Sequence, residues 1–169
     1  MKNTNGNVMV LAAEPPTIVD QIDFDFSDLT AGDMLALTRG DLARSVAVLQ
    51  KCVTVYDGGD PADANTWMDL DVDTEYPRVI EALTAALKNV KATDVVADCD
   101  IDLKGLKVRD MDAFSRGDVA ACAKILAARI TRYDGGSISE EQLLEMPLFS
   151  EYRAIINALT DKLKARAKK

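Results

Sequence analysis

The 169-residue sequence contains no histidine, few aromatic residues (5%) and three cysteines. Without histidine the chain lacks the usual general base at neutral pH, the Ser-His and Cys-His nucleophile pairs and any imidazole metal ligand. The cysteines, Cys52, Cys99 and Cys122, have no CxxC spacing, which predicts reduced thiols in a cytoplasmic protein. These absences favour a non-enzymatic protein that needs no cofactor and no metal.

Long hydrophobic runs are also missing. The apolar stretch at residues 8–13 is too short for a signal-peptide core or a membrane span. The chain has 20 Lys and Arg against 28 Asp and Glu, a net charge of -8, which argues against nucleic acid as a partner. We therefore expect a soluble cytoplasmic protein whose partners are neither membranes nor nucleic acids.

The sequence does contain an internal repeat, and such a repeat determines how the whole fold is organised. Residues 39–59, RGDLARSVAVLQKCVTVYDGG, match residues 116–136, RGDVAACAKILAARITRYDGG, at 10 of 21 positions. Farther on, residues 75–88, EYPRVIEALTAALK, match residues 151–164, EYRAIINALTDKLK, at 8 of 14 positions. The chain is therefore predicted to contain two copies of one small unit.

The repeat predicts an N-terminal arm at residues 1–22, a first unit at 23–92 and a second unit at 93–169. Each unit is expected to have a short extended lead-in, which alternates acidic and apolar residues, followed by about three helices. A first short helix leads to an RGD turn, where Asp41 and Asp118 are predicted to cap the second helix. The twofold occurrence of RGD at these turns favours a structural role over cell adhesion.

The second helix is predicted to run to the DGG sequence and to bury one face, because its apolar residues recur every three or four positions. This face comprises Leu42, Val46, Leu49, Val53 and Tyr56, and in the second unit Val119, Ala123, Leu126, Ile130 and Tyr133. The last helix has a similar face at Tyr76, Ile80, Leu83 and Leu87, and at Tyr152, Ile156, Leu159 and Leu163.

One unit of this size would be marginally stable by itself. We therefore predict a mainly α-helical protein in which two pseudo-twofold-related units pack as one body around one shared core. The Ala-rich, aromatic-poor composition agrees with a helical fold.

The loop before the last helix differs most between the units and contains apolar residues in polar surroundings. These are Trp67 and Met68 in the first unit, and Leu143, Leu144, Met146, Leu148 and Phe149 in the second. The candidates for contact with a partner are Trp67, Met68, Leu144, Met146 and Phe149. Two interpretations remain open: the residues close the core, or they form an exposed patch that binds a protein partner.

The same loop carries Asp69, Asp71 and Asp73, which alternate like the start of a calcium-binding loop. An EF-hand would continue with Gly at the sixth position and Glu at the twelfth, where this chain has Thr74 and Ile80. A solvated acidic loop is the better interpretation.

Charge is divided unevenly along the chain. Residues 1–102 hold 7 basic and 19 acidic residues, whereas residues 103–169 hold 13 basic and 9 acidic ones. The two parts could attract one another within a molecule or between molecules, and such head-to-tail contact could build rings or chains. Charge that is merely screened by solvent is the alternative.

Residues 24–53, FDFSDLTAGDMLALTRGDLARSVAVLQKCV, precede a short acidic loop and the helix EYPRVIEALTAAL. This arrangement resembles the small tail assembly chaperones of long-tailed bacteriophages, over residues 23–90 and more faintly over 100–164. The resemblance implies a protein that binds the long helical tape measure protein through an apolar helical groove bordered by acidic charge. It also implies that the protein keeps this partner soluble while the tail tube assembles around it. The tandem duplication departs from the single-unit form of that family.

Two other functions are consistent with the sequence. A structural subunit of a phage particle or other assembly would account for the opposite charges of the two parts through self-association. An acidic inhibitor that mimics nucleic acid ranks below it, because several acidic residues are expected at caps and turns. These residues are Asp41, Asp57, Asp118 and Asp134.

Overall fold

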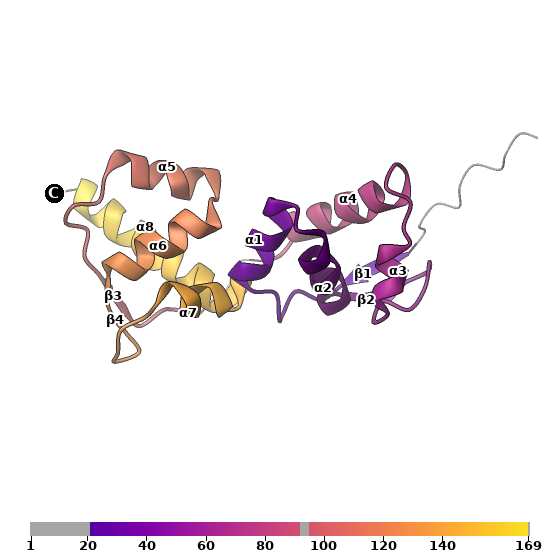
Figure 1. Ribbon diagram of the computed structural model, residues 1–169. Helices are drawn as coiled ribbons and strands as arrows, with labels where there is room; N and C mark the ends of the chain where they lie inside the picture. The colour runs from indigo at the N-terminus through magenta and orange to yellow at the C-terminus, as the bar shows by residue number, and fades with distance from the viewer. Residues whose placement is uncertain (1–20, 92–94, 169) are drawn as a thin grey trace, which may run out of the picture.

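The computed structural model describes residues 21–91 and 95–168, so almost all of the predicted N-terminal arm lies outside the described residues. Within the described ranges, eight α-helices and four short strands form two lobes that lie side by side (Figure 1). The mainly helical fold expected from the sequence is confirmed.

The two units have the same order of elements, apart from one π-helical turn in the second. The first unit contains β1 (Ile22–Phe24), α1 (Ala31–Arg39), α2 (Leu42–Cys52), β2 (Val53–Tyr56), α3 (Ala64–Met68) and α4 (Glu75–Lys88). The second contains β3 (Cys99–Ile101), α5 (Val108–Arg116), α6 (Val119–Arg129), β4 (Ile130–Tyr133), α7 (Glu140–Glu145), the π-helical turn η1 (Leu148–Tyr152) and α8 (Arg153–Ala167).

Each lead-in is a strand, as expected, but its partner was not predicted. The strand β1 pairs antiparallel with β2, and β3 pairs in the same way with β4. The prediction that the second helix continues to the DGG sequence is therefore wrong, because α2 ends at Cys52 and α6 ends at Arg129. The following residues, VTVY and ITRY, are rich in β-branched and aromatic side chains that favour a strand once the lead-in offers a partner.

The RGD corners cap the following helices as predicted. The Asp41 carboxylate accepts a hydrogen bond from the Arg44 amide at 3.1 Å, and Asp118 accepts one from Ala121 at 3.0 Å. The glycine of each RGD has a φ of 67°, a left-handed conformation that suits glycine and ends the preceding helix. This geometry accounts for the repeated RGD without any role in adhesion.

The variable loop contains a short helix in each unit, so each unit has four helices rather than about three. The cap of α3 is Asp63 and that of α7 is Ser139, 76 residues farther on. Trp67 and Leu143, also 76 apart, are both buried. We therefore call two residues matched when they lie 77 positions apart before this loop, or 76 apart from Asp63 onward.

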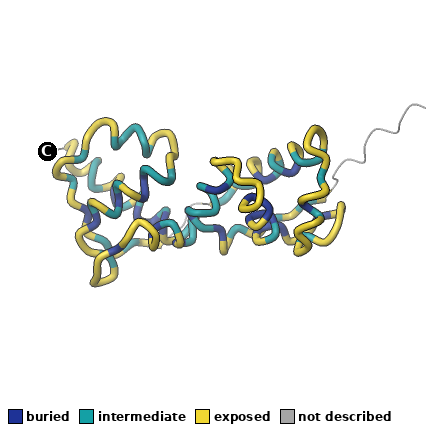
Figure 2. Tube along the Cα trace, in the orientation of Figure 1, coloured by how far each residue is buried: buried dark blue, intermediate teal, exposed yellow. Residues whose placement is uncertain are grey.

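The buried residues form two clusters rather than the one shared core that we predicted (Figure 2). Leu49, Trp67 and Leu83 belong to the first cluster, and Leu126 and Leu143 belong to the second. Each unit can fill its own core because its short helix, α3 or α7, contributes a large buried side chain. Trp67 fills this place in the first unit and Leu143 in the second, so each cluster is filled almost entirely by side chains of its own unit.

The two units meet in a head-to-tail contact instead of a pseudo-twofold one. Helices α1 and α5 each pack on the next helix of their own unit, α2 and α6, and α1 also lies against α6 and α7 of the second unit. Within the described residues, α5 has no comparable contact with the first unit. The arrangement is therefore heterologous, with different surfaces contributed by the two sides.

Candidate binding groove

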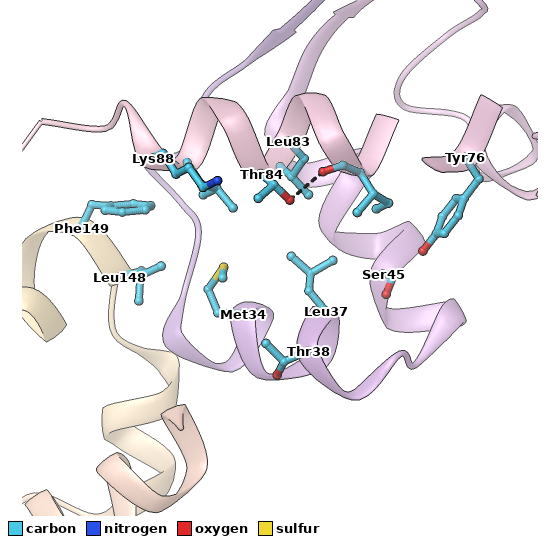
Figure 3. A pocket seen from close by; sticks show the side chains of 12 residues that line it. Met34, Leu37, Thr38, Ser45, Tyr76, Leu83, Thr84, Lys88, Leu148 and Phe149 are labelled. Carbon is cyan, nitrogen blue, oxygen red and sulfur yellow. Dashed lines mark hydrogen bonds between the residues drawn. The ribbon is translucent and has the colours of Figure 1, made fainter. Parts of the chain in front are cut away.

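An open apolar groove of about 540 Å³ lies between α1 and α4 of the first unit (Figure 3). Most of its lining comes from these two helices, with additions from α2 and from η1 of the second unit. The lining residues are Met34, Leu37, Thr38, Ser45, Tyr76, Ile80, Leu83, Thr84, Leu87, Lys88, Leu148 and Phe149.

The spacing of apolar residues on α4 positions its side of the groove. Ile80, Leu83 and Leu87 follow one another at intervals of three and four, so they lie in one stripe along the helix. Leu83 is buried at the floor, while Ile80 and Leu87 are half-buried along the wall. The apolar face that the spacing predicts on this helix is therefore buried only at its centre, at Leu83.

Local hydrogen bonds fix α1, which forms the opposite wall. Thr30 and Asp33 form a capping box, in which each side chain accepts a hydrogen bond from the other residue's amide. Lys51 of α2 donates to the Asp33 carboxylate at 2.7 Å and ties the two helices together. Met34 and Leu37 on this helix then face the groove (Figure 3).

The second unit closes one end of the groove. The Leu148 amide donates a 2.7 Å hydrogen bond to the Leu29 carbonyl, which places Leu148 beside Met34 (Figure 3). The Phe149 ring lies 6.1 Å from the ring of Phe26, centroid to centroid. The groove is therefore built by both units, although its walls belong to the first.

The hydroxyl groups of Thr38, Ser45 and Thr84 in the lining donate to backbone carbonyls three or four residues earlier. The Ser45 hydroxyl donates to the Asp41 carbonyl at 2.8 Å, and the Thr84 hydroxyl donates to the Ile80 carbonyl at 2.7 Å. Lys88 is the one charged residue in the lining, which contains no carboxylate. This lining can pack against an apolar surface.

The lining residues of the first unit recur at matched positions in the second. Seven of the ten are identical and the other three are Leu37, Thr38 and Ser45, which match Phe114, Ser115 and Cys122. The identical pairs are Met34 and Met111, Tyr76 and Tyr152, Ile80 and Ile156, Leu83 and Leu159, Thr84 and Thr160, Leu87 and Leu163, and Lys88 and Lys164.

The structure separates the five residues that the sequence singled out in the variable loops. Trp67 is 2% exposed, its Nε1 donates to the Pro61 carbonyl at 2.9 Å, and its ring lies 4.8 Å from that of Tyr56. Met146 is also buried. Trp67 and Met146 therefore close the core, which is one of the two interpretations that the sequence left open.

The other three lie in different places and do not form one patch. Met68 is 55% exposed at the end of α3. Leu144 is half-buried where α7 meets α1, and its carbonyl lies opposite Gly32. Phe149 alone among the five lines the groove.

Two cysteines and one aspartate outside the groove have shifted pKa values. Burial raises the pKa of Cys52 and of Cys122 to about 11, so both thiols stay protonated at neutral pH. In the acidic loop, Asp71 accepts hydrogen bonds from the amides of Asp73 and Thr74, which lower its pKa together with the Thr74 hydroxyl. No cluster of potential metal ligands occurs in the described residues, and no helix there could span a membrane.

The chain matches no protein-family model, and no curated protein or solved structure is significantly similar to it.

Proposed function

We propose that this chain is a non-enzymatic protein that binds a helical segment of a partner protein in the groove between α1 and α4. The observation that supports this is the half-buried apolar lining and its recurrence at matched positions in the second unit. We infer that the chain is a tandem duplication. Ile80 and Leu87, like their matches Ile156 and Leu163, pack against the buried cluster of their own unit, and in the first unit they also line the open groove.

An amphipathic helix is the occupant that best fits the lining. An extended strand would need backbone hydrogen-bond partners, whereas a helix satisfies its own backbone and presents apolar residues every three or four positions. The longer wall, α4, has 14 residues, which corresponds to a length of about 21 Å or four turns.

The net negative charge of the first unit favours a partner helix with basic residues beside its apolar face. Residues 23–92 hold 13 acidic and 6 basic residues, a net charge of -7. A partner helix with an apolar face and basic flanks would therefore be attracted to this unit at low salt.

We further propose that the partner is a phage tape measure protein and that the chain acts as a tail assembly chaperone in the host cytoplasm. A tape measure protein is long and helical, so it offers many amphipathic segments that need cover before the tube forms. The support is the resemblance of residues 23–90 to that family together with the groove that these residues form. A subunit that stays in a particle is the alternative, favoured by the exposed apolar residues Met68, Val72 and Val108.

Binding of the proposed partner can be tested with overlapping 30-residue segments of the long helical tape measure protein that is encoded in the same genome as this chain. Each segment is titrated into isotope-labelled full chain and followed by amide chemical shifts. We expect saturable shifts at α1 and α4, which Thr84→Arg abolishes because the new side chain occupies the groove. Thr131→Arg is the matched control, since Thr131 is likewise exposed and its hydroxyl also donates to a backbone carbonyl, that of Asp100.

The outcomes separate the alternatives. Binding that Thr131→Arg leaves intact and Thr84→Arg removes supports the groove as the site. Binding that survives Thr84→Arg places the site elsewhere, and the absence of binding by every segment contradicts the chaperone role.

A further inference from the structure

We propose that copies of this chain associate head to tail, with the segment after α3 of one copy lying against the start of α5 in the next. The contact would repeat the one that joins the two units within the chain. This inference is independent of what the groove binds.

The contact within the chain serves as the template. Residues 29–31 and 146–148 lie antiparallel, where the Ala31 amide donates to the Met146 carbonyl at 3.2 Å and the Leu148 amide donates to the Leu29 carbonyl at 2.7 Å. Thr30 and Pro147 form the bridge between these two hydrogen bonds. Ala31 is completely buried there.

Most residues matched to this contact are exposed, and two of them, Leu70 and Leu106, are half-buried. Val108 matches Ala31 and is 88% exposed, and Val72 matches Leu148 and is 73% exposed. Met68, which matches Leu144, is 55% exposed. Exposure alone does not mark an interaction surface, since Val96 is 89% exposed as well; what singles out these three residues is that each matches a residue of the contact within the chain. Each half of the contact inside the chain thus has an uncovered counterpart on the other unit.

The charges beside these apolar residues are complementary. Asp69, Asp71 and Asp73 surround Val72, and all three are exposed. Lys107 and Arg109 flank Val108 and are exposed as well. Head-to-tail contact brings acidic and basic residues together, whereas contact between two identical ends would bring like charges together.

Two differences between matched positions make the contact between copies weaker than the contact within the chain. Val108, which is larger, stands at the position matched to Ala31, which is completely buried. A Cβ atom on Gly32 would lie 3.1 Å from the Leu144 carbonyl oxygen, and the residue matched to Gly32 is Arg109. The next copy must therefore sit slightly farther away. We expect reversible association that increases with protein concentration and decreases with salt.

The experiment is sedimentation velocity of the full chain over a range of concentrations. The average mass should rise with concentration for the unaltered chain, and Val72→Asp or Val108→Asp should each weaken this association about tenfold. An equimolar mixture of the two variants should form dimers, because the Val72→Asp chain keeps its α5 end and the Val108→Asp chain keeps its α3 end. Val96→Asp is the control, since Val96 is 89% exposed and lies outside both surfaces.

Circular dichroism and thermal unfolding of each variant check that the fold is retained, as the exposure of the three valines predicts. A chain that remains monomeric up to its solubility limit would overturn the proposal. Failure of the two variants to associate in the mixture would also overturn it. A head-to-tail contact requires the intact α5 end of one variant to bind the intact α3 end of the other, whereas a contact between two identical ends would not be restored by mixing. Equal loss of association in Val96→Asp would also contradict it.

Discussion

The Leu148 amide and the Leu29 carbonyl, 2.7 Å apart, join the two units of this protein through their backbones. The neighbouring Ala31–Met146 hydrogen bond extends this joint, and the apolar clusters on either side remain separate. Contacts between units of this kind are smaller than a common core, so each unit should respond to mutation largely by itself.

Truncation of a buried leucine should therefore act on one unit. Leu49 is fully buried in the first cluster, so Leu49→Ala should lower the free energy of unfolding of that unit by about 3 kcal/mol. Hydrogen exchange should become faster in α2 and α4 and change little in α6 and α8.

The matched variant Leu126→Ala provides the control, because Leu126 is fully buried in the second cluster. It should speed exchange in α6 and α8 instead. Equal acceleration in both units by either variant would mean that the two clusters unfold as one.

The joint between the units should be sensitive to volume at Gly32. A side chain there meets the Leu144 carbonyl, whose oxygen is 3.1 Å from the position of the first added atom. Gly32→Val should cost about 2 kcal/mol through overpacking and should increase the maximum dimension in small-angle X-ray scattering as the units separate. Thr38→Val is the control on the same helix, where Thr38 is exposed. An unchanged scattering curve for Gly32→Val would show that the joint tolerates the added volume.

Acid should weaken the link between α1 and α2. Burial raises the pKa of Asp33, but the hydrogen bonds from Lys51 and from Thr30 outweigh it, so the pKa is lowered overall. A lowered pKa in the folded protein contributes stability that is present above about pH 4 and is lost as the pH falls below it.

Asp33→Asn should accordingly remove about 1 kcal/mol at pH 7 and flatten the pH dependence of the free energy of unfolding below about pH 4. Asp110→Asn is the comparison, because Asp110 accepts a hydrogen bond from the Lys107 amide as Asp33 does from the Thr30 amide. Asp110 has no threonine hydroxyl beside it, and Ala128 stands at the position matched to Lys51. If both variants flatten the curve equally, the Lys51 contact is not the cause.

Trp67 reports on the first cluster because it is the one tryptophan of the chain. Its burial predicts blue-shifted fluorescence and poor quenching by iodide in the free protein. Trp67→Leu, which introduces the residue found at the matched position 143, should cost about 2 kcal/mol through lost volume and a lost hydrogen bond. Met68→Leu, one residue farther along, should be nearly neutral. Strong quenching of the unaltered protein would contradict the burial of Trp67.

Local chemistry explains which elements could be predicted from the sequence. Asp41 and Asp118 were identifiable as caps because a cap needs only a carboxylate beside a turn and a following helical pattern. The strand β2 was missed because Val53 and Tyr56 continue the helical spacing from Leu49, so periodicity alone could not separate the two structures. The pairing with β1 decides between them, and it joins residues about 30 positions apart.

The groove illustrates a different limit. The spacing on α4 identified an apolar stripe, but the extent of its burial depends on where α1 lies. That position is set by Gly40 at the corner and by the Asp33–Lys51 contact, neither of which the periodicity of α4 reveals. The short helix α3 was missed because its five residues are too few to establish a period.

Ala31 belongs to the first unit by sequence but is buried among residues of the second, including Leu143 and Met146. The boundary of the repeat and the boundary of the packing therefore fall at different points along the chain. A protease cut between the units would therefore separate Ala31 from the buried cluster to which it belongs. The N-terminal fragment would keep every buried member of its own cluster and lose only Leu148 and Phe149, which pack on the outside of it. The C-terminal fragment would lose a completely buried residue, so it should be the fragment that aggregates or is degraded first.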